Sequence, residues 1–151
     1  METTFINQNS EKNIVEAGQQ CMESTIEAIR GWMEYGTDEE SCFDSSDEAE
    51  TFFAEHGDFN EYGLELSYIM PKDDEPGYLC FLMSTGGPGD ELRLYYSPGN
   101  WANPYYIEYV YLDWFAGAGF DVTGEDWAKW ISEYFGECEQ PEHCFNAVCE
   151  E

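Results

Sequence analysis

Residues 78–96 read YLCFLMSTGGPGDELRLYY, and this stretch decides the fold. The apolar run at 78–84 has the length and composition of a strand from the interior of a sheet. The glycine-rich segment 86–90 is typical of a turn. Leu92, Leu94 and Tyr96 then follow at every second position, which is the spacing of one face of a strand. The stretch therefore predicts two strands joined by a tight turn.

The same pattern continues on both sides of this hairpin. Upstream, residues 64–70 alternate between apolar and polar side chains, and the charged segment 71–77 supplies a turn. Downstream, Ser97-Pro98-Gly99-Asn100 makes another turn, and a fourth strand follows at 105–112. These spacings predict a four-stranded antiparallel meander.

Helical periodicity flanks the meander. Apolar residues recur at helical spacing over 11–34, and this helix should end before Gly36. The segment Ser45-Ser46-Asp47 offers an N-cap for a short second helix, with Glu48 and Glu50 in its first turn and its end at Gly57. The last helix follows Thr123 and ends at Gly136.

The fold class is therefore α+β, with two N-terminal helices, a four-stranded antiparallel meander and a C-terminal helix, and the helices packed on one face of the sheet. Residues 116–119 are interpreted as a small-residue link. We expect a single domain over 1–151. Residues 1–9 are interpreted as a loose end with one short strand around 4–6, and 137–151 as a loose end too.

Composition excludes several partners. The 151 residues include 33 Asp and Glu against 5 Lys and Arg, a formal net charge of −28, so the chain cannot offer nucleic acid or an anionic membrane a basic patch. No apolar run reaches the length of about 18 residues that a membrane span needs. The first residues lack the basic and apolar regions of a signal peptide. We expect a cytoplasmic protein, folded rather than disordered because 17% of its residues are aromatic.

The charge is unevenly distributed along the chain. Spread over the surface expected for this size, it would give roughly one charge per 280 Å², against roughly one per 110 Å² for duplex DNA. Between Gly31 and Pro71, however, there are 12 acids and no Lys or Arg, and a second cation-free acidic stretch follows Lys129. Clustering of this kind would bring one face close to the charge density of DNA.

No other pattern predicts chemistry. Cys138, His143, Cys144 and Cys149 are residue types that bind zinc, but their spacing is unlike that of zinc sites, so no metal and no cofactor is predicted. Asp73, Asp74 and Glu75 are interpreted as a hairpin turn rather than a calcium loop. Asp90, Glu91 and Arg93 are expected to form local pairs. No acid, base and nucleophile occur together in a catalytic pattern, so we do not expect an enzyme.

Small size, extreme acidity and a cation-free acidic segment resemble the DNA-mimic inhibitors of phages and mobile elements, which block restriction or CRISPR–Cas machinery. A second resemblance, carried by segments 86–93, 107–109 and 113–115, is to uncharacterised proteins of bacterial mobile elements, and it implies no activity. The leading hypothesis is an inhibitor that occupies the basic DNA channel of a host nuclease complex. From charge placement, the predicted phosphate surrogates are Glu34, Asp38, Glu39, Glu40, Asp44, Asp47, Glu48, Glu50, Glu55 and Asp58.

Other functions remain open at this point. An acidic adaptor or immunity-type protein for a basic partner outside DNA defence has the same charge signature. Adaptation to high salt is a third explanation, and it predicts a fold that needs molar salt. Aromatic residues such as Trp101, Tyr105 and Tyr106 would either support a homodimer that extends the acidic face or belong to the core.

Overall fold

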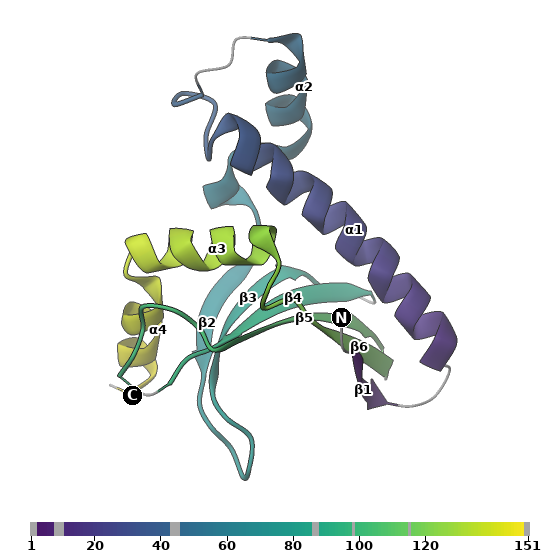
Figure 1. Ribbon diagram of the computed structural model, residues 1–151, viewed down its shortest axis with the longest axis vertical. Helices are drawn as coiled ribbons and strands as arrows, with labels where there is room; N and C mark the ends of the chain where they lie inside the picture. Colours follow the sequence, from purple (N-terminus) through teal and green to yellow (C-terminus); the bar gives the residue numbers. More distant parts are fainter. Residues whose placement is uncertain are drawn as a thin grey trace.

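The structure is a computed structural model that describes residues 3–7, 11–42, 46–85, 88–97, 99–114 and 116–149. These residues form four α-helices, a short 3-10 helix and a six-stranded antiparallel sheet with the order β1-β6-β5-β4-β3-β2 (Figure 1). Strands β2 to β6 form a five-stranded meander, and β1 pairs with β6 at the edge. The strands are β1 Thr3–Asn7, β2 Glu65–Ile69, β3 Tyr78–Ser84, β4 Gly89–Tyr95, β5 Tyr106–Asp113 and β6 Ala116–Asp121.

The hairpin predicted from residues 78–96 is confirmed and supplies the middle of the core. Leu79 of β3 lies opposite Leu94 of β4, and Phe81 lies opposite Leu92. Leu79, Leu92 and Leu94 are completely buried. Their alternation places one face of the sheet against the helices, as the period of two predicted.

Interpreting residues 116–119 as a link was wrong, because they belong to a fifth meander strand, β6. Glycine and alanine have low β propensity, so a strand made of them gives little signal in the sequence. Packing explains the small residues: Ala118 is completely buried on the helix side, and a side chain at Gly18 would meet the Phe120 ring at 3.0 Å. Small residues on both elements let the first helix approach the sheet closely.

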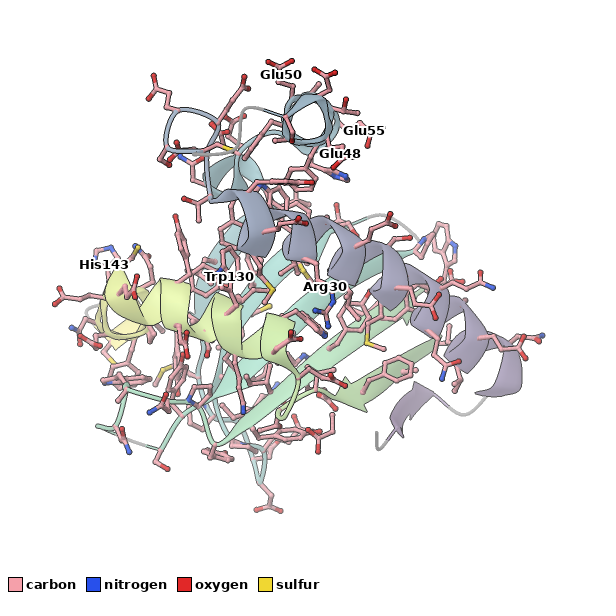
Figure 2. The ribbon with its side chains drawn as sticks, turned by 45° about the horizontal axis from the view of Figure 1, so that its top comes forward. Arg30, Glu48, Glu50, Glu55, Trp130 and His143 are labelled. Atoms are coloured by element: carbon pink, nitrogen blue, oxygen red, sulfur yellow. The ribbon has the colours of Figure 1, made fainter. Side chains whose placement is uncertain are left out.

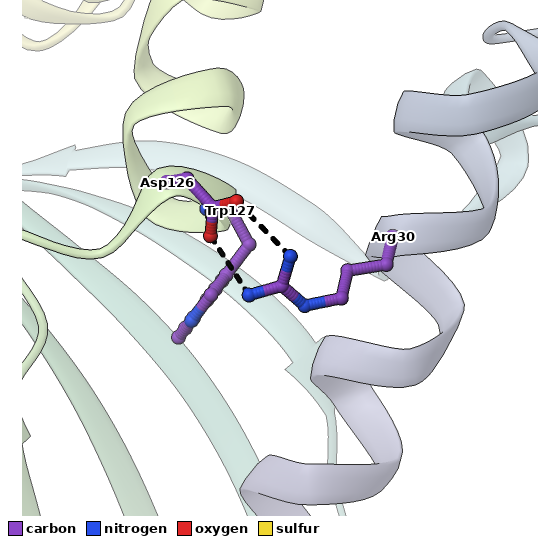
Figure 3. Close-up of polar contacts among 3 residues, drawn as sticks. All are labelled: Arg30, Asp126 and Trp127. Atoms are coloured by element: carbon purple, nitrogen blue, oxygen red, sulfur yellow. Dashed lines mark hydrogen bonds and ion pairs between the residues drawn. The ribbon is translucent and has the colours of Figure 1, made fainter.

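Helix α1 spans Glu11–Tyr35, in agreement with the prediction, and crosses β5 and β6 on one face of the sheet (Figure 1). It ends at Gly36, whose φ of 111° suits glycine and whose N–H donates to the Trp32 carbonyl at 2.9 Å. Arg30 donates hydrogen bonds to both carboxylate oxygens of Asp126, at 2.8 and 3.0 Å (Figure 3). This ion pair connects α1 to residue 126, the first residue of the next helix.

Helix α3, Asp126–Glu137, is the predicted C-terminal helix and buries Trp127, Ile131 and Phe135. The prediction of a loose end at 137–151 was wrong for residues 140–149, which form α4, Gln140–Cys149. This helix packs on β2 and β3, where Phe145 meets Tyr68 with ring centroids 5.1 Å apart. Its apolar stripe is short, so the sequence pattern alone did not separate it from a tail. The short strand expected around 4–6 is present as β1.

Helix α2, Asp47–His56, does not cover the sheet as predicted for the helices. It packs on the C-terminal end of α1 and stands clear of the sheet at one end of the molecule (Figure 1). The N-cap lies in the predicted segment and is Ser46, whose hydroxyl accepts a hydrogen bond from the Ala49 N–H at 3.2 Å. The 3-10 helix η1, Phe59–Glu61, then leads back to β2. We call residues 34–42 and 46–61 the acidic lobe.

Candidate functional site

An aromatic cluster beneath the acidic lobe fixes it to the rest of the protein. Trp32, only 1% exposed, has ring contacts with Phe52, Phe59 and Tyr62 at centroid distances of 5.5, 5.3 and 4.9 Å. Its indole N–H donates to the Gly57 carbonyl at 3.0 Å. Ring contacts and this hydrogen bond join α1, α2 and η1 into one unit, so the lobe presents its side chains from a rigid support.

The structure places nine of the ten predicted phosphate surrogates on this lobe; the tenth, Asp44, lies outside the described residues. Glu34 is in the last turn of α1, and Asp47, Glu48, Glu50 and Glu55 are on α2. Figure 2 shows Glu48, Glu50 and Glu55 around α2, at the end of the molecule that stands clear of the sheet. The other four, Asp38, Glu39, Glu40 and Asp58, come from the loops before and after α2.

These four loop acids converge. Together with Asn60 they line a hollow of about 610 Å³, which we call the acidic hollow. Asp58 accepts a hydrogen bond from the Glu39 N–H at 3.1 Å. Asp38 accepts two from Ser41, from the N–H and from the hydroxyl, both at 2.7 Å, and these bonds lower the pKa of Asp38. Hydrogen bonds to the charged form thus hold the carboxylates in place.

The lobe contains no Lys or Arg, because the chain has none between residues 31 and 71, and its one histidine, His56, lies 3.8 Å from Glu55 at the end of α2. Arg30, just before it, is engaged by Asp126. Arg93 is on the opposite side of the core, where its Nε lies 2.7 Å from a Glu91 oxygen and its guanidinium stacks 4.9 Å over Tyr78. The negative field of the lobe is therefore not neutralised from within.

Carboxylates also gather at the C-terminal helices. Glu133, Glu137 and Glu142 line a second hollow of about 690 Å³ with Trp101 and the turn that contains Gly99. The three glutamates belong to the second cation-free stretch of the sequence, where no site residues were predicted. Trp101 is part of the packing here, with its ring 5.0 Å from Phe145, whereas Tyr105 is exposed.

A groove beside the lobe has no signal in the sequence. It holds about 290 Å³ between η1, the start of β2 and the junction of α3 with α4. Its walls are mainly aromatic and aliphatic, and we call it the aromatic groove: Phe59, Asn60, Tyr62, Gly63, Leu64, Glu65, Leu66, Phe81, Tyr134, Phe135, Cys138 and Gln140. The walls come from three segments far apart in the chain, so no local pattern could have revealed them. Leu64, which precedes β2 and is exposed, belongs to the regular alternation over 64–70 and so gave no separate sign of the groove.

The expectation of local pairs at 90–93 is confirmed for Glu91 with Arg93 and wrong for Asp90. Asp90 is buried between α1 and the sheet, where the hydroxyls of Thr25, Ser84 and Tyr109 donate to it at 2.9, 2.6 and 2.7 Å. Burial, and then the Asp90 charge, raise the pKa of Tyr109. Neutral donors thus satisfy a buried carboxylate that the sequence assigned to a turn.

The cysteine and histidine residues of the C-terminus are dispersed. Cys144 is buried and its Sγ lies 3.7 Å from the Leu66 carbonyl, whereas Cys138, His143 and Cys149 are exposed. Within the described ranges, no three His, Cys, Asp or Glu side chains form a group that could hold a metal ion. The segment 73–75 forms the turn of the β2–β3 hairpin, as predicted, and the backbones of Lys72 and Glu75 pair as an antiparallel bridge.

Comparisons with known proteins returned no match, whether against family models, curated proteins or solved structures. None of the helices in the described part of the chain is long and apolar enough to cross a lipid bilayer.

Proposed function

We propose that this chain is a DNA-mimic inhibitor that occupies the basic DNA-binding channel of a bacterial defence complex, either a CRISPR–Cas effector or a restriction enzyme. The observation that supports this best is the acidic lobe, a rigid projection with nine of the predicted carboxylates and no Lys or Arg. A channel built for DNA is lined with cations and attracts any dense array of anions.

Charge density supports a localised mimic rather than a uniformly acidic surface. With 28 net charges over 9037 Å², the chain averages about 320 Å² per charge, well short of the roughly 110 Å² of duplex DNA. Four carboxylates around a single hollow concentrate the charge locally. Because the lobe is held by buried aromatic rings, little entropy is lost in ordering it on binding.

Carboxylates in this role replace phosphates collectively. Each would pair with Lys or Arg of the channel, and binding would release counterions from both partners. Such an inhibitor binds protein rather than nucleic acid, needs no cofactor and acts in the cytoplasm of the host bacterium.

The alternative is an acidic adaptor or immunity-type protein whose basic partner has no role in DNA defence. The aromatic groove favours this alternative, because a hydrophobic anchor is a common feature of protein–protein interfaces and is not required for mimicry of a DNA backbone.

A competition assay separates the two functions. Labelled duplex DNA is bound to each of a panel of purified restriction enzymes and CRISPR–Cas effectors, and the protein is added at increasing concentration. The proposal predicts that DNA is displaced from at least one of them, and that displacement weakens at least tenfold between about 50 and 200 mM salt. Capture from host lysate of a basic partner without nuclease or DNA-binding activity, with no displacement across the panel, would favour the alternative.

A further inference from the structure

The acidic hollow and the aromatic groove are neighbours across η1. Asn60 lines both, and Phe59, the residue before it, forms part of the groove wall. The Phe59 N–H donates to the Thr37 carbonyl at 2.7 Å, next to Asp38 of the hollow. Burial raises the pKa of Tyr134 in the groove, and nearby Cys138 and Asp38 raise it further. The two concavities therefore form one continuous surface with an anionic half and an apolar half.

The groove has the size and lining of a side-chain pocket. Its volume of about 290 Å³ lies at the lower end of the range for small-molecule sites, so it suits one or two bulky side chains. Leu64 on its wall is 61% exposed, so this aliphatic side chain is available for contact with a ligand. A side chain at Gly63 would meet the Phe81 ring at 2.5 Å, so glycine there keeps the wall open against the sheet.

The charge around the surface restricts what can bind. Among the residues that line either concavity there is no Lys or Arg, while five are acidic. An anionic ligand, such as a nucleotide or an acidic peptide, would be repelled, and a second copy of this chain carries the same charge of −28. Charge complementarity therefore requires a cationic group beside an apolar one.

We propose that the basic partner docks here through a segment that carries a bulky apolar side chain next to Lys or Arg. The apolar side chain fills the aromatic groove while the cation enters the acidic hollow. This inference rests on the proposed function in requiring a basic protein as partner, and it adds a hydrophobic anchor that fixes the partner's register. Such anchors supply much of the binding energy in interfaces whose charges mainly guide association.

Three capped peptides test the proposal: Gly-Arg-Leu-Arg-Gly, Gly-Arg-Gly-Arg-Gly and Gly-Glu-Leu-Glu-Gly. Each is titrated into the whole protein labelled with nitrogen-15, and amide shifts are followed by NMR. The Arg-Leu-Arg peptide should shift amides at Asn60, Leu64 and Tyr134 and bind about tenfold more tightly than Arg-Gly-Arg. The Glu-Leu-Glu peptide should produce no shifts at either concavity.

Variants assign the binding to the groove. Leu64→Asn should remove the advantage of Arg-Leu-Arg over Arg-Gly-Arg, whereas Ile69→Asn, at a 41% exposed aliphatic position on β2 that does not line the groove, should leave it unchanged. Equal affinity of the two arginine peptides, with shifts confined to the lobe, would overturn the groove proposal and leave the acidic interface standing. If neither arginine peptide perturbs the lobe, the basic-partner function itself fails.

Discussion

Asp90 shows how one residue joins the two layers of the protein. Its carboxylate accepts hydrogen bonds from Thr25 on α1 and from Ser84 and Tyr109 on the sheet. The sequence placed Asp90 at the end of a glycine-rich turn, where an acid is ordinarily exposed. The two buried hydroxyls, of Tyr109 and Thr25, come from positions 19 and 65 residues away, so sequence alone could not predict this network.

Loss of this carboxylate should destabilise the fold. Asp90→Ala leaves the buried hydroxyls of Thr25 and Tyr109 without their acceptor and should lower the free energy of unfolding by about 2 kcal/mol. The matched control is Asp74→Ala in the exposed β2–β3 turn, which should change it by less than about 0.5 kcal/mol. Urea denaturation measures both. Equal stability of Asp90→Ala and the control would show that the network contributes nothing net.

Thiol reactivity tests the burial of individual cysteines. Burial, with the charge of Glu91 beside it, raises the pKa of Cys80 to about 12, and burial also raises the pKa of Cys144. Because the thiolate is the reactive form, these two should react slowly with a thiol reagent at pH 8 while exposed Cys138 and Cys149 react quickly. Peptide mapping after a short labelling pulse distinguishes them. Rapid labelling of Cys80 would contradict its burial in the sheet beside Glu91 of β4.

At the scale of elements, the signal in the sequence was strongest where one periodicity ran long. Helix α1 and strands β3 and β4 followed from their spacing, and the N-cap of α2 followed from a serine before acids. Strand β6 was missed because Gly and Ala have low β propensity, and the place of these residues in the sheet is set by pairing with β5 and β1. Helix α4 was missed because its apolar stripe is short, and its contacts are with β2, more than 70 residues earlier.

The contact between α1 and α2 depends on Gly31. An added Cβ there would lie 1.9 Å from the Phe52 ring, so Gly31→Ala should displace α2 and cost about 2 kcal/mol of stability. Gly136→Ala is the matched control, because it also lies in a helix but has no neighbour within 4 Å, and alanine should stabilise it slightly. Hydrogen exchange reports the effect: amides of 47–61 should exchange faster in Gly31→Ala. Unchanged protection there would show that the lobe does not depend on this packing.

The candidate site, like the fold, was predictable from sequence only where its residues lie close together along the chain. The acids of the lobe were identified from sequence because they cluster between residues 34 and 58, where the chain has no Lys or Arg. Which of them share a hollow depended on the loop at 36–42 folding against Asp58, and that needed the structure. The aromatic groove is a purely tertiary feature.

For the whole molecule, the net charge of −28 predicts opposite effects of salt on folding and on binding. Self-repulsion destabilises the compact state, so screening should raise the melting temperature between about 20 and 200 mM salt. Over the same range, affinity for a basic channel should fall. Thermal denaturation and the DNA competition assay measure the two effects. A fold that forms only in molar salt would instead indicate adaptation to high salt.

The central claim is that the acidic lobe, and not the net charge, makes the interface. Two quadruple variants raise the net charge equally: Glu39, Glu40, Glu48 and Glu50 to Lys on the lobe, and Glu16, Glu23, Glu27 and Asp74 to Lys outside it. All eight side chains are exposed, so both variants should keep the fold by circular dichroism. Displacement of DNA from a susceptible defence complex should be abolished by the lobe variant and retained by the other. Equal loss in both, or full displacement by the lobe variant, would contradict the account.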